Sequence, residues 1–404
     1  MIHSSHFEPR AYAFKGSMAS IEIDRAQELR GTLALNREKI KEIGRVGLVD
    51  WRKRIPTLGL TLSQLEYGSM EFWQMLANTS AADTTITEAD FKETMIDIAG
   101  YKTDDNAAFL GTVWYPDLRL QSFSLNIGDP EAYIMRSFNF VGEDEIILQN
   151  ANKYLIVREM TAVGAASNEA FIISDGGSTY PNPVMDPDNS GQYLLKVVHY
   201  DLSATTSTEL EVTTDYTFNG TTTATILRAT GTGDTLKFYW SAGTYITGGD
   251  IFTNNDGTSS ISADSCDIWL ETSQQVYKLQ SLGINVGLTR SDYKEIGNSK
   301  IIQRGVKETV STITLGRILE AYTIEEILRD KTGLSYGLIN PRNFADDIAL
   351  KIKLYTDNTK DTFAMQYSFT NLSPTNLDAG VPLDDYVTAG NSLESDNFTV
   401  TNIA

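Results

Sequence analysis

The residues that could bind a metal ion are few and scattered. His3, His6 and His199 are the chain's histidines; the first two lie near the N-terminus, and the third stands alone in a strand-like run. A metal site needs several donors on a rigid frame. The run 186–191, DPDNSG, begins like a calcium loop, but Val197 stands where that loop needs an acidic ligand. We therefore predict no metal site and no cofactor.

Carboxylate pairs are the remaining candidates for acid–base chemistry. Asp384-Asp385 and Glu143-Asp144 both flank turn residues, which favours exposed side chains over the buried ones whose pKa values shift. The sequence contains no glycine-rich phosphate loop, nucleophile elbow or cysteine–histidine pair. Its five tryptophans are dispersed, which disfavours the aromatic-lined groove of a polysaccharide-degrading enzyme. We expect a protein that is not an enzyme.

Two basic segments stand out in an acidic chain. The first contains Trp51, Arg52, Lys53 and Arg54, and the second contains Lys300, Arg304 and Lys307. One reading is that both dock onto acidic surfaces of a neighbouring copy, and a tryptophan beside three cations favours such a contact. The other reading is a pair of solvated loops.

Composition limits the classes of partner. The 404 residues include 33 basic and 53 acidic side chains, a net charge of −20, which disfavours a protein that grips nucleic acid phosphates. Cys266 is the single cysteine, so no disulfide can form within the chain, as suits a protein made in reducing cytosol. No signal-peptide pattern and no run of about 18 apolar residues occurs, so we predict neither secretion by a signal peptide nor a membrane anchor.

The two basic segments lie at equivalent places of an internal repeat. The segment LALNREKIKEIGRVGLV from Leu33 aligns with VGLTRSDYKEIGNSKII from Val286, 253 residues later. In each, alternating apolar residues lead to a charged tip and return, the pattern of a β-hairpin. A short helix follows, starting near Ser69 or Thr323, with Ile324, Ile327 and Leu328 on one face of the second helix.

Further strands close each repeat. In the first, the runs from Gly111 to the turn Gly128-Asp129-Pro130 and MRSFNFVGED read as strands; in the second, FAMQYSF, NLDAG around Gly380 and DNFTV take the matching places. Between the repeats lies an acidic segment rich in Ser, Thr and Gly, whose short strand-like runs predict a small β-sandwich.

The sequence thus predicts a mainly β protein with three domains. They are a first β domain at 1–155, an inserted β-sandwich at 156–265 and a second β domain at 266–404, each outer domain containing one short helix.

The hairpin, helix and strand unit, ending in SFSLNIGDPEAYIMRSFNFVGED, resembles the tail tube proteins of long-tailed bacteriophages, in particular those with two fused copies of the tube domain. The middle segment resembles the immunoglobulin-like domains that such proteins often bear. The resemblance implies that sheets join edge to edge into a β-barrel ring of six domains, and therefore of three chains with pseudo-sixfold symmetry. Rings would stack through the hairpin tips around Trp51 and Arg304 into a tube with a negatively charged channel, through which DNA passes without specific binding.

The implied partners are other copies of the chain, the tape-measure protein and the tail terminator and tip proteins. The implied location is the tail of the virion, with assembly in the host cytoplasm. Other readings stay open: a head decoration, neck or fibre protein, or the tube of a contractile injection machine. An intact repeat favours a ring former over a decoration protein, which needs no repeat.

Overall fold

The computed structural model is mainly β, as expected. It describes residues 7–13, 21–40, 50–77, 79, 82–91, 95–103, 109–129, 131–175, 180–185, 192–204, 206–243, 260–271, 274–276, 279–293, 303–319, 323–331, 339–380 and 388–402. The chain forms two compact units, each made of three stretches of sequence. The first unit consists of Met1–Ile23, Met95–Leu118 and Asp144–Asn254, and the second of Asp24–Thr94, Arg119–Glu143 and Asn255–Ala404. No helix in the described ranges is long and apolar enough to cross a membrane.

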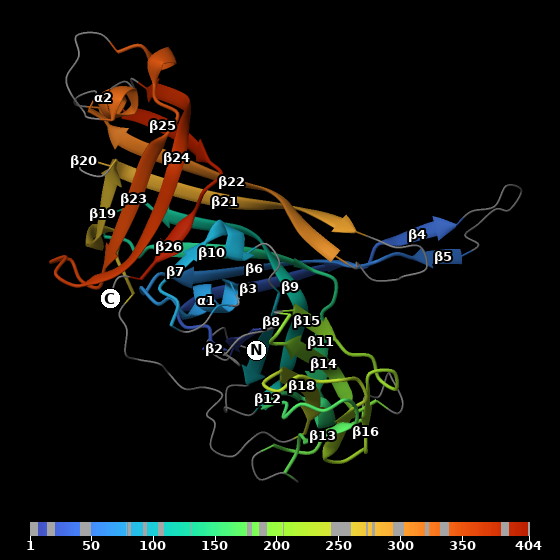
Figure 1. Cartoon of the computed structure of the whole chain (residues 1–404). Coiled ribbons are helices and arrows are strands. Elements are labelled where there is room, and N and C mark those ends of the chain that lie inside the picture. Colours follow the sequence, from blue (N-terminus) through green and yellow to red (C-terminus); the bar gives the residue numbers. More distant parts are fainter. Residues whose placement is uncertain are drawn as a thin grey trace, which may run out of the picture. The chain divides into compact units, whose positions relative to one another are not determined.

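The second unit is built on one antiparallel sheet, the central sheet, whose strands follow the order β3–β6–β10–β9–β21–β22–β25–β24 (Figure 1). These strands are β3 (Ala26–Ala34), β6 (Thr57–Leu65), β9 (Phe109–Ile127), β10 (Met135–Gly142), β21 (Leu279–Tyr293), β22 (Gln303–Ile318), β24 (Phe363–Gly380) and β25 (Thr388–Ser395). Strand β9 begins in the first unit and continues into the central sheet. Segments far apart in the sequence are therefore hydrogen-bonded neighbours.

Alternation of side chains gives the central sheet two different faces. Leu58, Leu60 and Leu62 of β6 are buried on one face, whereas Thr57, Gly59 and Thr61 point to the other. The same alternation holds for β10 and β21, because successive side chains of a strand point to opposite sides of the sheet. We call the face of Leu60 the core face and the face of Thr61 the open face.

An aromatic cluster fills the core face beside helix α1 (Glu71–Ala77). Trp73 is fully buried, and its ring centroid lies 4.8 Å from that of Phe123, 5.2 Å from Phe138 and 5.7 Å from Phe398. Ser69 accepts a hydrogen bond from the amide of Glu71, which agrees with its predicted place before the helix. In α2 (Thr323–Asp330) the predicted face is confirmed, since Ile324, Ile327 and Leu328 are buried.

A second sheet of this unit has the order β20–β19–β23–β24–β26–β7. Its remaining elements are β7 (Thr85–Thr87), β19 (Cys266–Leu270), β20 (Gln274–Gln275), β23 (Ile348–Tyr355) and β26 (Thr399–Thr401), with the 3₁₀ helices η2 (Glu88–Phe91), η4 (Ala263–Ser265) and η5 (Pro341–Asn343). FAMQYSF and NLDAG, expected as separate strands, belong to one long strand, β24, while β25 was not anticipated.

A two-stranded arm continues the β3–β6 hairpin. It consists of β4 (Arg37–Ile40) and β5 (Asp50–Lys53), and Figure 1 shows it extending past the end of the central sheet. At its base, the Asn36 side chain donates to the carbonyl of Ile55 and to the hydroxyl of Thr57. The long charged hairpin tip expected from the sequence is therefore a hairpin with its own short sheet.

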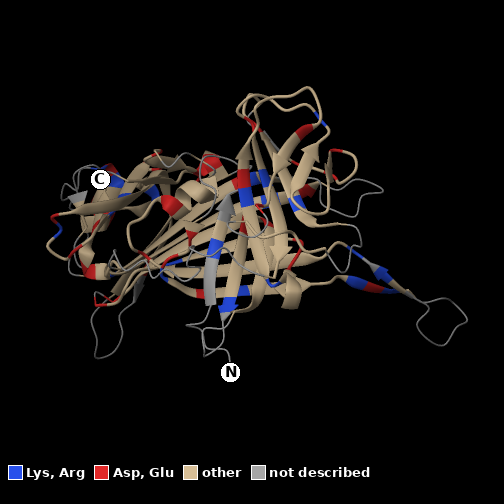
Figure 2. Cartoon of the chain, turned by 90° about the horizontal axis from the view of Figure 1, so that it is seen from below, with Lys and Arg blue, Asp and Glu red and all other residues tan. Residues whose placement is uncertain are grey.

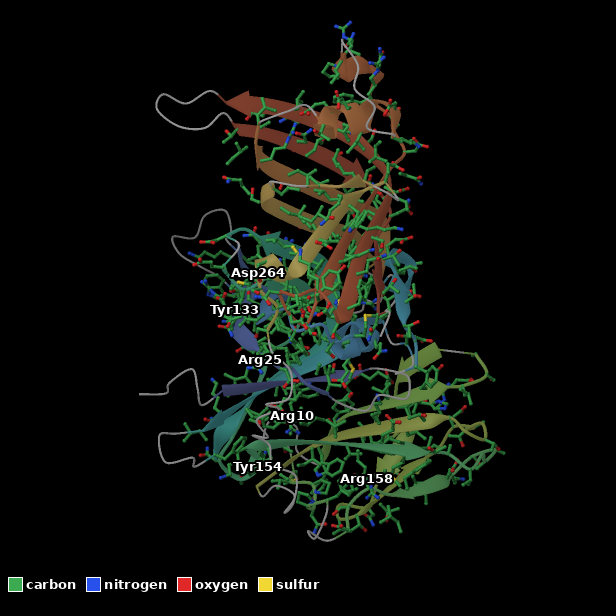
Figure 3. The ribbon with its side chains drawn as sticks, turned by 90° about the vertical axis from the view of Figure 1, so that its left-hand side faces the viewer. Arg10, Arg25, Tyr133, Tyr154, Arg158 and Asp264 are labelled. Carbon is green, nitrogen blue, oxygen red and sulfur yellow. The ribbon has the colours of Figure 1, made fainter. Side chains whose placement is uncertain are left out.

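The first unit contains three layers of strands. Two sheets face each other across a buried cluster that includes Phe171, Phe238 and Trp240, and the larger sheet packs its other side on β8 and β9 through Trp114, stacked on Tyr239. The larger sheet has the order β12–β18–β14–β15, the smaller β13–β17–β16, and the third β2–β1–β8–β9–β11. Figure 3 labels Arg158 of β12, whose guanidinium lies 4.1 Å from the ring centroid of Tyr180.

The elements of this unit are β1 (Phe7–Ala13), β2 (Ile21–Glu22), β8 (Ile96–Thr103), β11 (Ile146–Gln149), η3 (Asn150–Asn152), β12 (Tyr154–Thr161), β13 (Glu169–Ile172), β14 (Leu194–Asp201), β15 (Thr206–Glu209), β16 (Tyr216–Phe218), β17 (Thr223–Ile226) and β18 (Thr235–Ala242). Two facing sheets do occur in the middle of the chain, and the larger of them is also the middle layer of this unit.

A buried ion cluster ties the sandwich to β8 and β9. The Lys196 ammonium lies 2.9 Å from a carboxylate oxygen of Asp97 and 2.7 Å from one of Asp117. Burial opposes the charge on Lys196, but the two carboxylates outweigh it and raise the pKa of the ammonium. A buried cation held in this way positions β14 against the layer of β8 and β9.

Replacing Lys196 tests this attachment. Lys196→Ala leaves the Asp97 carboxylate buried without its cation, so we expect the opening free energy of the first unit to fall by about 3–5 kcal/mol. Hydrogen exchange of peptides covering β14 and β18 measures it, with peptides from β22 in the second unit as the internal control. The double variant Lys196→Met, Asp97→Leu should recover part of the loss; equal losses in both variants would contradict a role for the unpaired charge.

Candidate assembly surfaces

The predicted stacking residues of the first basic segment lie on the arm. Trp51 is 45% exposed, and the Lys39 ammonium lies 5.2 Å from its ring centroid. Two hydrogen bonds, of 3.0 and 2.5 Å, join the Arg54 guanidinium to a carboxylate oxygen of Glu38, and they hold the pKa of that carboxyl below its usual value. Figure 2 shows basic and acidic residues close together along the arm.

The remaining predicted stacking residues are described in part. Arg52 is exposed on the arm, and Lys53 belongs to β5, but its side chain lies outside the described residues. Lys307 is exposed on β22, the side chain of Arg304 lies outside the described residues, and so does the whole of Lys300. The arm therefore presents an exposed tryptophan among basic residues. One of these, Arg54, already forms an ion pair with Glu38 of the same chain.

Two sets of eight strands pair in the same way. The first set is β1, β2, β3, β6, β8, β9, β10 and β11, and the second is β19 to β26. Leu29 opposes Leu62 in the first set, and 253 residues later Leu282 opposes Leu315 in the second. Leu62 also opposes Phe138, as Leu315 opposes Asn391.

Irregularities recur at the same places in both sets. The β3–β6 register shifts between Ala26 and Glu28, and the β21–β22 register shifts between Leu279 and Ser281. Asp117 in β9 and Asn371 in β24 occupy corresponding positions and both have left-handed backbone, with φ of 55° and 54°. Asp and Asn tolerate this conformation better than most residues. The similarity therefore extends beyond the hairpin and helix to strands whose sequences show little likeness.

The two sets meet where β9 pairs with β21. Phe123 opposes Val286 at this junction, and both side chains are buried. The register also identifies the residues that correspond to them. Leu377 of β24 corresponds to Phe123, because the two pair with corresponding residues of β25 and β10. Leu33 of β3 corresponds to Val286, because the two pair with corresponding residues of β6 and β22.

Leu377 and Leu33 lie on the two outer edges of the central sheet. Beyond β6, no described strand pairs with β3, and from residue 373 onward β24 pairs only with β25 among the described strands. Leu377 is 39% exposed and Leu33 is partly exposed. Unpaired strand edges carrying apolar side chains are sites where another chain can add. The two edges are complementary in register, since the internal junction already joins their counterparts.

A buried carboxylate connects the two sets below the central sheet. Glu66 accepts hydrogen bonds from the Arg136 guanidinium, 3.1 Å to each carboxylate oxygen, and from the Tyr367 hydroxyl at 2.6 Å. The amides of Tyr67 and Gly68 donate to it as well. Burial first, and then the neighbouring Glu66, raise the pKa of Tyr367 well above its usual value, so its hydroxyl remains a donor.

The second set has its own buried ion pair, between Arg317 of β22 and Glu325 of α2. Sequence reasoning missed all four charged residues of these two pairs. The buried position of Arg136 could have been predicted, because strand alternation places its side chain on the inward face. A charge buried there requires a partner of opposite charge.

The open face is polar and carries few charges. The Thr61 hydroxyl donates to the Asn139 side chain at 2.8 Å, and the Asn139 amide donates to the Ser122 hydroxyl at 3.0 Å. A concavity of about 760 Å³ lies over these residues and over Arg30 and Thr289. Alternation places Glu28, Glu308, Asp378 and Glu394 on this face, with Arg30 and Arg119 as its basic residues. Among the described residues, acidic side chains therefore outnumber basic ones.

Comparisons with known proteins give partial matches. No family model matches the chain, and no curated protein matches it. A chain of the extended sheath–tube complex of an extracellular contractile injection system, PVC, is similar at 11% identity over 35% of this chain and 92% of that chain, with a TM-score of 0.27.

Two further matches come from the anti-feeding prophage AFP. A chain of its tube terminating cap has 13% identity over 39% of this chain and 99% of that chain, with a TM-score of 0.28. A chain of its baseplate, with sixfold symmetry applied, has 13% identity over 37% of this chain and 96% of that chain, with a TM-score of 0.27.

The Glu66 carboxylate offers a direct test of the link between the sets. Glu66→Ala leaves the Arg136 guanidinium buried without a counter-charge, so we expect the unfolding free energy of the second unit to fall by about 3–5 kcal/mol. Hydrogen exchange of β6, β10 and β24 peptides measures the loss, and β14 peptides of the first unit serve as control. Adding Arg136→Met should restore part of the stability. A single variant as stable as the parent would contradict the link.

Proposed function

We propose that this chain is a structural, non-enzymatic subunit of a tail tube, in which three chains form a ring of pseudo-sixfold symmetry. The two strand sets are two fused copies of one tube domain, and the sandwich at 156–265 is an insertion between them. The observation that carries the proposal is the β9–β21 junction, together with two free edges of matching register. The number of chains follows from the six-domain rings of the family that the sequence resembles.

The ring closes by repeating between chains the junction that the chain contains within itself. Edge β24 of one chain joins edge β3 of the next, so that Leu377 opposes Leu33 and both become buried as Phe123 and Val286 are. A head-to-tail contact of this kind closes into a ring when its rotation divides the full circle. The closed sheet leaves no free edge in the central sheet.

The open face then lines the channel. Its hydroxyl and amide groups satisfy one another, as Thr61, Asn139 and Ser122 do, and its slight acidic excess repels phosphate weakly. DNA therefore passes without the counterion-releasing contacts that bind it to basic proteins. Such a tube belongs to the tail of a virion, is assembled in the host cytoplasm, and has the tape-measure, terminator and tip proteins as further partners.

Disulfide cross-linking tests the proposed edge contact. In a Cys266→Ala background, Leu33→Cys with Leu377→Cys should oxidise between chains, because opposed residues of paired strands have Cα atoms about 4.5–5.5 Å apart, within disulfide reach. Denaturing gels should show covalent species up to three chains and none larger. The control Leu29→Cys with Leu377→Cys keeps the same face but shifts the register. Equal cross-linking in both variants, or a larger covalent ring, would overturn the proposed register or the number of chains.

Charge reversal on the arm tests stacking of the rings. Arg52, Lys53 and Arg54 changed to Glu should abolish long tubes in negative-stain electron micrographs, because the arm would then repel an acidic neighbouring ring. Single rings should persist. The control replaces exposed basic residues outside the arm, Arg228→Glu and Arg342→Glu. Tubes of normal length at normal protein concentration in the arm variant would rule out this stacking contact.

A further inference from the structure

The two faces of the arm differ in charge. Lys39 opposes Trp51 in the β4–β5 ladder, so both side chains lie on one face, and strand alternation places Arg37 on it as well. All three side chains are exposed. The other face carries Glu38 opposite Arg52. Among the described side chains, the first face therefore combines a tryptophan with basic groups and no acidic one, and we call it the Trp51 face.

The end of the central sheet opposite to the arm carries an exposed tyrosine. Strand β6 begins at Thr57, at the base of the arm, and ends at Leu65, which opposes Met135 of β10. Just before β10, Tyr133 is 59% exposed and forms a bridge with Ser262, and Met135 is exposed too. Figure 1 shows the arm extending away from the sheet, and Figure 3, which views the chain from the opposite side, labels Tyr133. The arm and Tyr133 thus lie at opposite ends of the same sheet.

Three exposed carboxylates accompany this tyrosine. Asp129 and Glu131 lie in the turn between β9 and β10, and Asp264 lies in η4, next to the segment bridged to Tyr133. Among the described residues, none of the three carboxylates has an ion-pair partner. Arg25 is an exposed basic residue at the same end, where its carbonyl accepts the amide of Leu65, so acidic groups outnumber it. We call this area the Tyr133 surface; it consists of Asp129, Glu131, Tyr133, Met135 and Asp264.

The pairing of an acidic residue with a tyrosine recurs in the sequence of the second set. Asp384 and Tyr386 stand 253 residues after Glu131 and Tyr133, although the residues beside them differ. These two residues lie outside the described residues and are not part of the contact proposed below. Packing in the core does not account for Tyr133, because its side chain is mostly exposed. A surface contact does account for it.

We propose that the Trp51 face of the arm binds the Tyr133 surface of a chain in the next ring of the tube. The inference rests on the proposed function, because head-to-tail stacking brings the arm end of one ring to the opposite end of another. It identifies the acidic surface that the arm meets. It also assigns Arg37 and Lys39, on the Trp51 face, to the stacking contact.

The two surfaces are complementary in charge and in side-chain type. Residues 37–54 contain seven basic and three acidic residues, whereas the Tyr133 surface carries three carboxylates and no basic residue. The rings of Trp51 and Tyr133 supply an apolar centre, against which the Met135 thioether can pack. Arg37 and Lys39 then face carboxylates around that centre. Each chain has one arm and one Tyr133 surface at opposite ends, so the contact repeats from ring to ring along the tube.

An exchange of charges tests the contact. Arg37→Glu with Lys39→Glu should raise the protein concentration needed for tubes about tenfold or more, and so should Glu131→Lys with Asp264→Lys, because like charges then face each other. The chain with all four changes should return to within about threefold of the parent, because the charges are again opposite. Negative-stain micrographs of a dilution series measure the concentration.

Matched variants of the arm separate its two faces. Arg52→Glu makes the same change of charge on the other face and should shift the concentration less than about threefold, as expected of an exposed charge outside the contact. Trp51→Ala should raise the concentration about tenfold or more, because it removes the aromatic centre. Trp51→Phe keeps a ring and should have a smaller effect.

The edge cross-link shows whether each variant still forms rings. In the Cys266→Ala background, Leu33→Cys with Leu377→Cys should cross-link up to three chains in all of them, because the ring contact does not involve the arm. If rings persist but the fourfold exchange does not recover tubes, or if either reversed pair assembles like the parent, the arm does not bind the Tyr133 surface and the ring stands. If the edge pair fails to cross-link in the parent, the proposed function fails, and this contact fails with it.

Discussion

The architecture depends on keeping one buried carboxylate satisfied. Glu66 follows β6 directly, and its carboxylate accepts hydrogen bonds from Arg136 of β10, from Tyr367 of β24 and from two backbone amides. A charge in this position is tolerated only while every partner remains in place. Strands from both ends of the sequence are therefore held in one arrangement, and the aromatic cluster around Trp73 packs in the space that they define.

The second strand set also buries an arginine–carboxylate pair, but with residues at different positions. In the first set Arg136 opposes Gln64, and at the corresponding pair in the second set Arg317 opposes Ala389. The arginine has thus moved to the neighbouring strand, and its carboxylate partner has moved from the loop after β6 to Glu325 of α2. What is common to both sets is an inward cation neutralised below the sheet. Each set keeps its own charge balance.

The proposed assembly rests on strand edges that pair with no other described strand. The β9–β21 junction buries Phe123 and Val286, whereas the corresponding Leu377 and Leu33 remain at the sheet edges with part of their apolar surface in water. Ile147 on β11 stands in the same relation to the buried Val400. In each case a residue is exposed where its counterpart is covered, and in the proposed ring a further copy of the chain covers Leu377 and Leu33.

The sequence by itself was sufficient to predict features that depend on the local periodicity of apolar residues. The alternation of Leu58, Leu60 and Leu62 and the helix face of Ile324, Ile327 and Leu328 were predicted, because periodicity indicates which side chains must point inward.

Only the tertiary structure decided which strands are neighbours. Pairing of β9 with β21 joins residues about 160 positions apart, and it depends on the shared core and not on any local pattern. Strand β25 escaped prediction because Gly390, Asn391 and Ser392 are poor strand formers held by partners on both sides. The buried partners of Arg136 and Arg317 were equally hidden, since an ion pair between elements leaves no spacing in the sequence. Edges, junctions and buried charges are properties of the folded chain.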